Sequence, residues 1–314
     1  MAARHVPVLL REVVELLAPE RGGVFVDATL GLGGHAEAIL EAGPGVELVG
    51  IDRDRQALGL ARERLARFGP RVRLVEGNFA DLGELLGAEG IGRVAGILAD
   101  LGVSSLQIDS PERGFSFRFG GPLDMRMGHE GLTAADIVNE SSEEELAKIF
   151  WEYGEERQSR RIARAIVAAR REKPIETTSE LRRAIDRGKG HEAGHRNREG
   201  RVDPATRVFQ ALRIEVNEEL SGLLSFLDQA VDQLDAEGRL VIISYHSLED
   251  RIVKNTLRDL HRGEIDLVTG RPRSESQAIE LLTKRSVRPT EEEIAINPRS
   301  RSARLRAGRR LETR

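Results

Sequence analysis

Short apolar runs alternate with helix-like segments in the first hundred residues, and this alternation constrains the fold more than any other feature of the chain. The apolar runs are Val24–Leu30, Glu47–Asp52, Val72–Glu76 and Val94–Asp100. Between the second and third runs, the segment from Ala57 to Phe68 has its apolar residues at helical spacing. Strands that alternate with helices form a parallel sheet with right-handed crossovers, so the sequence predicts an α/β fold.

Composition supports a large core and excludes several kinds of site. The chain has 314 residues, of which 39% are hydrophobic, and this length favours two domains. A net charge of −4 gives no indication of a nucleic-acid partner. The absence of cysteine excludes a disulfide framework, a zinc–thiolate site and a cysteine nucleophile, and it suits a cytosolic protein. Residues 1–19 predict an amphipathic helix that is too short and too charged for a signal peptide or a membrane span.

After Asp100 the alternation stops, and the pattern of residues 133–206 predicts helices. Ser142 with Glu145, and Thr177 with Glu180, each predict a capping box at a helix start. Alternation then resumes with a long helix, a strongly apolar strand, another helix and two weaker β-like runs. These are Val208–Leu234, Arg239–Tyr245, Leu248–His261, Ile265–Val268 and Thr283–Val287.

The simplest organisation is one α/β domain that a helical insertion interrupts. We expect residues 1–104 to form its first part, 105–206 the insertion, and 207–314 its second part with a basic C-terminal tail. The predicted fold class is therefore a doubly wound, Rossmann-like α/β domain with a helical insertion domain.

Two segments are rich in arginine despite the acidic total. Residues 299–314 contain seven Arg and one Glu, and residues 157–171 predict a basic amphipathic helix. Both are candidate contacts for the phosphates of an RNA. The other interpretation is that these arginines lie on solvated surfaces. Residues 186–203 are polar and rich in glycine, and they predict an irregular loop.

A cluster of glycines follows the first predicted strand. Gly31, Gly33 and Gly34 lead into a helix that begins near Ala36. Glycine allows a sharp turn and lets a ligand approach the backbone, and the amides at the helix start can bind a polar ligand group. A plain strand-to-helix turn explains three glycines in four positions less well than a nucleotide-like cofactor does.

The glycine turn alone does not decide between NAD and S-adenosylmethionine. The pattern Gly31-x-Gly33-x-x-Ala36 fits a dinucleotide site, and Asp52 follows where an acid would hold ribose hydroxyls. Three features favour the methyl donor. They are Asp27 four residues before the first glycine, Asn78–Phe79 after the third strand as an adenine contact, and Asp100–Ser105 after the fourth strand.

Motifs along nearly the whole chain resemble those of one family, the bacterial 16S ribosomal RNA cytosine-N4 methyltransferases, also called ribosomal RNA small subunit methyltransferase H. The matching segments are His5–Leu9, Gly33–His35, Ile51–Arg53, Asp100–Ser105, Glu112–Phe117, Gly121–Met127, Tyr153–Arg157, Pro204–Arg207, Phe209–Arg213, Ser244–Arg251 and Asn297–Ser302. Tyr245 is a departure, because the family often has Phe there.

The resemblance implies an enzyme that transfers a methyl group from S-adenosylmethionine to the exocyclic N4 of a cytosine in the decoding region of 16S ribosomal RNA. It implies the small ribosomal subunit as partner, a cytoplasmic location and a helical insertion. The cofactor contacts that it implies are Gly33, Gly34, His35, Asp52, Phe79, Asp100 and Gln107.

Asp100 is also the candidate catalytic residue. Cytosine N4 is a weak nucleophile because its lone pair is delocalised into the ring, and a group that accepts an N4 hydrogen would localise that pair. Many base-amine methyltransferases have an Asp/Ser-Pro-Pro-aromatic motif here, whereas this chain has Asp-Leu-Gly-Val. A strand-end Asp can also simply order the next turn. His246 could act as a base, but Ser247 with Asp250 predicts a helix cap beside it, which favours a structural role.

Two other functions remain open from the residues. An NAD-dependent oxidoreductase would use the same glycine turn, but no proton-transfer residues are evident for it. A non-catalytic ribosome-binding protein would not need the Gly33–His35, Asp52 and Asp100 set. We expect no metal site, because the seven histidines show no paired spacing with carboxylates, and the sequence does not indicate an oligomeric state.

Overall fold

The computed structural model describes residues 7–118, 120–190, 203, 205–265, 273 and 276–312. Its contacts divide the chain into two compact units. Unit 1 comprises Met1–Gly102 and Leu220–Arg314, and unit 2 comprises Val103–Glu219. The insertion was predicted at 105–206, whereas unit 2 spans 103–219. The structure therefore assigns residues 207–219, which the sequence placed in the second part of the α/β domain, to unit 2.

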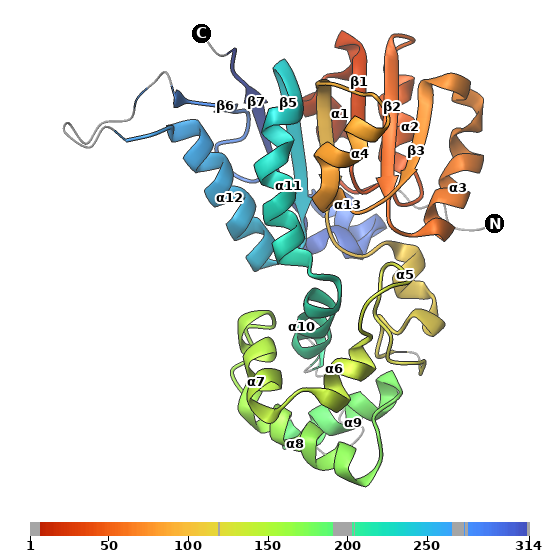
Figure 1. Ribbon diagram of the computed structural model, residues 1–314, viewed down its shortest axis with the longest axis vertical. Helices are drawn as coiled ribbons and strands as arrows, with labels where there is room; N and C mark the ends of the chain where they lie inside the picture. Colours follow the sequence, from red (N-terminus) through yellow and green to blue (C-terminus); the bar gives the residue numbers. More distant parts are fainter. Residues whose placement is uncertain are drawn as a thin grey trace. The chain divides into compact units, whose positions relative to one another are not determined.

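Unit 1 is built on a seven-stranded sheet with the order β3-β2-β1-β4-β5-β7-β6 (Figure 1). The strands are β1 (Gly23–Asp27), β2 (Val46–Asp52), β3 (Val72–Glu76), β4 (Val94–Asp100), β5 (Leu234–Ser244), β6 (Ile279–Leu281) and β7 (Arg304–Arg310). Strands β1 to β5 pair in parallel, whereas β7 is antiparallel to both β5 and β6. The predicted α/β class and its first four strands are confirmed, although β1 ends at Asp27 rather than Leu30.

Helices cover both faces of this sheet. One layer contains α1 (Leu10–Leu17), α2 (Gly34–Glu41) and α3 (Arg55–Leu65), and the other contains α4 (Leu82–Ala88), α11 (Glu219–Gln233) and α12 (Ser247–Arg262). Neighbouring strand residues point to opposite faces, so Phe25 packs with the first layer and Val26 with the second. The central strands are therefore buried on both sides, as their continuous apolar runs predicted.

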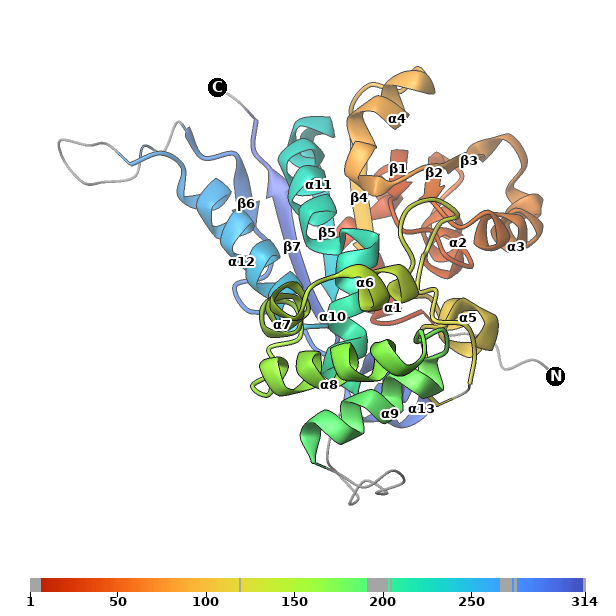
Figure 2. The same cartoon turned by 60° about the horizontal axis from the view of Figure 1, so that its bottom comes forward.

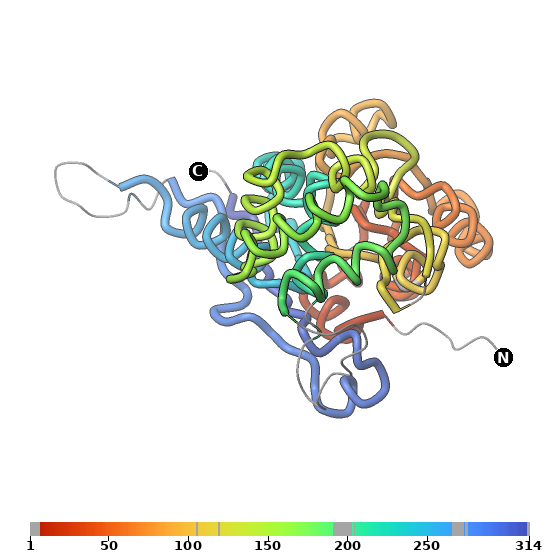
Figure 3. The backbone as a smooth tube through the Cα atoms, turned by 90° about the horizontal axis from the view of Figure 1, so that it is seen from below, coloured from red at the N-terminus to blue at the C-terminus, as the bar shows by residue number. Residues whose placement is uncertain are grey.

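The C-terminal segment is part of the sheet and is not a tail. Strand β7 pairs with β5 along Arg304–Arg310, which corrects the predicted basic tail. It follows α13 (Glu291–Ile296) and the 3-10 turn η6 (Pro298–Ser302). In Figure 3 this part of the chain lies beside the N-terminal helix, and the backbone N–H of Leu9 donates to Glu293 Oε1 at 2.7 Å.

The second of the two weaker β-like runs does not form the strand that the sequence predicted. Strand β6 occupies Ile279–Leu281, whereas the predicted Thr283–Val287 contributes a single bridge between Val287 and Leu305. Most of the predicted run Ile265–Val268 lies outside the described residues. The remaining short 3-10 turns are η1 (Pro19–Arg21), η2 (Ala66–Arg71), η3 (Phe79–Asp81) and η4 (Pro111–Arg113).

Unit 2 is helical, as predicted for the insertion (Figure 2). Its helices are α5 (Ser105–Asp109), α6 (Ala134–Glu140), α7 (Glu143–Glu152), α8 (Ser159–Glu172), α9 (Thr178–Lys189) and α10 (Thr206–Asn217). The capping boxes at Ser142 and Thr177 are confirmed. Helix α9 continues to Lys189, and residues 191–202 of the predicted loop lie outside the described residues.

The predicted helix Val208–Leu234 is two helices. Glu218 has φ of 50°, and this left-handed residue ends α10 and separates it from α11. The apolar face of α10 then packs into the core of unit 2, with Val208, Phe209 and Leu212 buried there. In the described part of the chain, no helix is both long and apolar enough to cross a membrane.

Candidate active site

The sheet order reverses between β1 and β4, and this switch point is where doubly wound folds bind their ligands. Because β1, β2 and β4 are parallel, their carboxyl ends lie at the same edge of the sheet. Each of these strands ends in an aspartate, at Asp27, Asp52 and Asp100. The structure therefore places the three predicted acidic residues along one edge, beside the glycine turn.

The glycine turn leaves room for a ligand at its first glycine. Gly31 and Gly33 have φ of 51° and 73°, which favours glycine over residues with a side chain. A Cβ at Gly31 would meet only the backbone oxygen of Thr29, at 3.9 Å. Gly34 is different, because a Cβ there would lie 2.5 Å from Pro7 Cγ. Gly34 therefore permits close packing of the N-terminal segment, and its predicted cofactor contact stays a prediction.

Asp52 fixes the glycine turn to the end of β2. Its Oδ2 accepts a hydrogen bond from the Gly31 backbone at 2.8 Å, and its Oδ1 accepts one from Asp54 at 2.9 Å. Burial raises the pKa of Asp52 above its usual value. Each carboxylate oxygen can accept further hydrogen bonds, so Asp52 can also hold the hydroxyls of a ribose.

His35 lies in the first turn of α2 and is buried. Its Nε2 donates to the backbone oxygen of Val8 at 2.9 Å, and its Nδ1 lies 3.7 Å from Asp100 Oδ2. Both ring nitrogens therefore face groups of the protein. His35 ties the N-terminal segment to the site, and a direct contact with the cofactor stays a prediction.

Asp100 is held at the end of β4 from both sides. Its backbone N–H donates to Thr29 Oγ1 at 2.6 Å, and its Oδ1 accepts a hydrogen bond from the Tyr245 hydroxyl at 2.8 Å. The Asp100 side chain retains 23% exposure, so a ligand can reach it. The contact with Tyr245 was not predicted from the sequence. The only sign at that position was a Tyr where the family often has Phe.

Asp27 is the most buried acid of the site. It is 1% exposed, and its Oδ1 accepts a hydrogen bond from the Thr29 backbone at 3.2 Å. Burial raises the pKa of Asp27 to about 7, although His35 opposes the rise. A carboxyl that is protonated for part of the time near neutral pH lowers the total negative charge beside Asp100.

Phe79 and Gln107 belong to different units. Phe79 begins η3 after β3 and packs edge-to-face on Phe226, with ring centroids 5.3 Å apart and planes at 75°. Asn78 caps that turn by accepting from the Ala80 backbone. Gln107 lies in unit 2, where its side chain caps α5 by accepting from Ser104 N at 3.0 Å. Their cofactor contacts stay predictions.

His246 is itself the cap of α12, which corrects the predicted cap at Ser247 and Asp250. The His246 side chain accepts from the Glu249 backbone, and Glu249 Oε2 accepts from the backbone N–H groups of Tyr245 and His246. The carboxylate of Asp250 instead pairs with arginines of β7. His246 therefore has a structural role in this arrangement.

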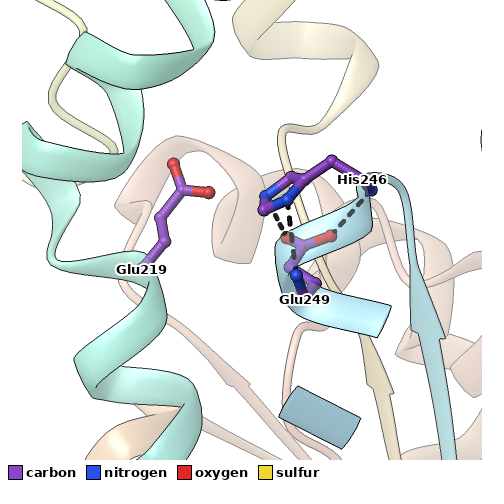
Figure 4. Close-up of side chains that lie close together, drawn as sticks. All are labelled: Glu219, His246 and Glu249. Atoms are coloured by element: carbon purple, nitrogen blue, oxygen red, sulfur yellow. Dashed lines mark hydrogen bonds and ion pairs between the residues drawn. The ribbon is translucent and has the colours of Figure 1, made fainter. Parts of the chain in front are cut away.

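Figure 4 draws His246 and Glu249 of unit 1 together with Glu219, the last residue of unit 2, and each of these side chains could offer a metal ligand. The prediction that no histidine shows paired spacing with a carboxylate is wrong for His246, which lies three positions before Glu249 and whose Nε2 lies 3.2 Å from Glu249 Oε1. The expected absence of a metal site stays a prediction. Arg213 donates to both carboxylate oxygens of Glu219, at 2.7 and 2.8 Å. The ion pair accounts for Glu219, and the helix cap accounts for Glu249 and for Nδ1 of His246, whereas His246 Nε2 is a buried atom without a hydrogen-bond partner among the described residues.

Comparison with known proteins assigns the family. The model of the MraW methylase family matches residues 2–311. The chain belongs to the MraW methylase family. A protein of Rhodopseudomonas palustris is 49% identical over 312 residues, covering 98% of this chain and 91% of the relative. A protein of Thermobifida fusca is 50% identical over 318 residues, covering 98% and 94%. Each is named "Ribosomal RNA small subunit methyltransferase H".

Membership of this family confirms the resemblance predicted from the motifs. It also confirms a methyltransferase that uses S-adenosylmethionine, in preference to an NAD-dependent oxidoreductase or a non-catalytic binding protein on the same fold.

Proposed function

We propose that this methyltransferase methylates the exocyclic N4 of a cytosine in the decoding region of 16S ribosomal RNA, within the small ribosomal subunit and hence in the cytoplasm. The observation that supports it most directly is the partly exposed carboxylate of Asp100, fixed at the sheet's switch point beside the glycine turn. The names of the relatives give the same class of substrate.

The residues at the sheet edge fit S-adenosylmethionine. The open side of Gly31 accommodates a close ligand, Asp52 offers acceptors for ribose hydroxyls, and Phe79 offers an aromatic side chain for the adenine. When bound, the cofactor supplies a methyl group that its sulfonium already activates. Asp100, Gly33, Gly34, His35 and Gln107 complete the set that the resemblance implies.

The chain's part in the chemistry is to orient the base and to accept a hydrogen from its amine. Asp100 lies where a carboxylate can accept an N4 hydrogen bond, which localises the nitrogen lone pair for attack and receives the proton that the amine must lose. A stacked cytosine must first leave its neighbours, at a cost of about a few kcal/mol.

Helix α8 offers a surface for the phosphates of the RNA. Arg160, Arg161 and Arg171 are exposed, and no described carboxylate lies within ion-pair distance of them. Exposed guanidinium groups on one helix suit the recognition of backbone charge rather than sequence. We therefore assign the RNA contact of unit 2 to α8.

The test is methyl transfer from labelled S-adenosylmethionine to small subunits that lack the modification, followed by nuclease digestion to locate the label. We expect label at N4 of a single decoding-region cytosine. Asp52→Ala should weaken cofactor binding by calorimetry by at least about tenfold, because it removes the ribose acceptors and loosens the glycine turn. Glu76→Ala is the matched control, since Glu76 ends the neighbouring strand β3 and should leave binding unchanged. Label at another base or atom would refute the proposed substrate.

A further inference from the structure

We propose that Tyr245 is a positioning residue for Asp100, whose carboxylate it holds in the one orientation that presents the acceptor for the cytosine amine. Its hydroxyl donates to Oδ1 at 2.8 Å, while Oδ2 of the same carboxylate faces His35 Nδ1 at 3.7 Å. The proposal rests on the function proposed above, in which Asp100 accepts the N4 hydrogen.

The backbone of unit 1 brings these two residues together from 145 positions apart. Asp100 is the last residue of β4 and pairs with Ile243 of β5, and Tyr245 follows directly after β5. The backbone N–H of Leu101 donates to Ile243 O at 2.9 Å, which extends the register beyond the strand end. The distance between the phenol and the carboxylate is therefore set by the parallel pairing of two central strands.

The backbone and the ring of Tyr245 each make one further contact. Its backbone N–H donates to Glu249 Oε2 at 2.8 Å, at the start of α12. Gly102 has φ of 96°, and a Cβ built there would lie 3.4 Å from Tyr245 Cδ2, so the ring lies directly against the chain that leaves β4. A ring held in this way gives its hydroxyl a defined direction.

The surroundings of the hydroxyl also favour its protonated form, in which it is a donor. Burial, followed by the adjacent charge of Asp100, raises the pKa of Tyr245 well above its usual value. A phenol that stays protonated can give its one hydrogen to the carboxylate. Hydrogen bonds to a charged acceptor are the stronger ones, and they restrict the rotation of the carboxyl group. Asp100 thus meets its substrate already oriented, as an efficient acceptor requires.

The first test needs neither cofactor nor RNA. The chain has two tyrosines, so Tyr153→Phe leaves Tyr245 as the only one. Tyr153 belongs to unit 2, at the end of α7, and is outside the proposed site. In this background, the tyrosine Fermi doublet of the Raman spectrum should show a strong hydrogen-bond donor, and Asp100→Ala should shift it toward a weak donor. A doublet that Asp100→Ala leaves unchanged would overturn the proposal.

The second test measures catalysis. Tyr245→Phe keeps the ring and removes the hydroxyl, and we expect kcat to fall about tenfold, the loss of one charged hydrogen bond. KM for the small subunit should not change, because the RNA surface is intact. The acid limb of the kcat–pH profile should move to higher pH, because the carboxylate loses a donor that favours its charged form.

Tyr153→Phe is the matched control and should retain the wild-type rate and pH profile. A hydroxyl that only stabilises the fold would lower the melting temperature of Tyr245→Phe without moving the profile, and that result would overturn the proposal. A Raman shift together with no methyl transfer by the wild-type enzyme would instead refute the proposed function and leave the Tyr245–Asp100 contact standing.

Discussion

Two segments, β7 and α8, are both rich in arginine, but their arginines differ in how many partners they have. In β7, Arg304 and Arg306 pair with Asp250, and Arg309 pairs with Glu237 and Glu280. Arg310 donates to the backbone oxygens of Val231, Asp232 and Leu234. In α8, Arg164 pairs with Glu143 and Arg170 donates to Val138 O, while Arg160, Arg161 and Arg171 are exposed.

The number of arginines in a segment therefore does not predict a phosphate-binding surface. A guanidinium that already donates to a carboxylate must lose that partner before it can bind a phosphate. The arginines of β7 hold a strand in place: three of them pair with carboxylates and Arg310 donates to backbone oxygens, all within unit 1. In α8, by contrast, Arg160, Arg161 and Arg171 have no described carboxylate within ion-pair distance, so their charge is available for a partner.

The largest effect that distinguishes the two segments should follow from Asp250→Ala. Arg306 is 12% exposed, so removal of its carboxylate leaves a buried charge without a partner. We expect the free energy of unfolding to fall by roughly 3 kcal/mol, measured by urea denaturation. Asp259→Ala is the control in the same helix, because its exposed pair with Arg258 should contribute less than about 1 kcal/mol.

This effect should depend on pH in a defined direction. Burial tends to raise the pKa of Asp250, but hydrogen bonds from Arg306 and Arg304 outweigh it, and the net pKa is lowered. A lowered folded-state pKa stabilises the fold above the unfolded value of about 4, and this stabilisation is lost as the pH falls through the folded-state pKa. The difference in the free energy of unfolding between wild type and Asp250→Ala should become smaller only at acidic pH. A constant difference at every pH would show that the ion pair is not its cause.

A smaller effect, on binding alone, should follow from Arg160→Ala in α8. Loss of one phosphate contact should reduce the slope of log affinity against log salt by about 0.7–0.9 for ribosomal RNA. The free energy of unfolding should stay within about 0.5 kcal/mol of wild type, because Arg160 is exposed. Arg62→Ala, an exposed arginine of α3 in unit 1, removes the same charge elsewhere. Equal changes in slope for both variants would mean that overall charge, and not α8, determines the binding.

Sequence alone predicted the parts of the fold that rest on local patterns. The first four strands and the glycine turn follow from apolar runs that end in small or acidic residues. The capping boxes at Ser142 and Thr177 follow from side chains three residues apart. The break at Glu218 could not be predicted, because no glycine or proline marks this left-handed residue.

Strand β7 was not predicted, because its many arginines led to the interpretation of a basic tail. Ala303, Leu305 and Ala307 alternate with arginines and are buried against one face of the sheet, so a period-two signal was present. Its carboxylate partners come from distant segments, such as Asp250, which is 56 positions from Arg306. For the same reason the contact between Tyr245 and Asp100 could not be predicted: it depends on the pairing of β4 with β5, which no local pattern specifies.

The smallest effect should follow from Arg309→Ala, which tests whether the arginines of β7 serve only the fold. The Arg309 side chain is 32% exposed, and its partners Glu237 and Glu280 are 42% and 47% exposed, so this ion-pair group is open to solvent on both sides. If β7 serves only the fold, the variant should lose no more than about 1 kcal/mol of unfolding free energy and keep the wild-type salt slope of RNA binding. A slope reduced as much as in Arg160→Ala would show that Arg309 exchanges its carboxylates for phosphate. The ion pairs of β7 would then be a resting arrangement, and both arginine-rich segments would contact the RNA.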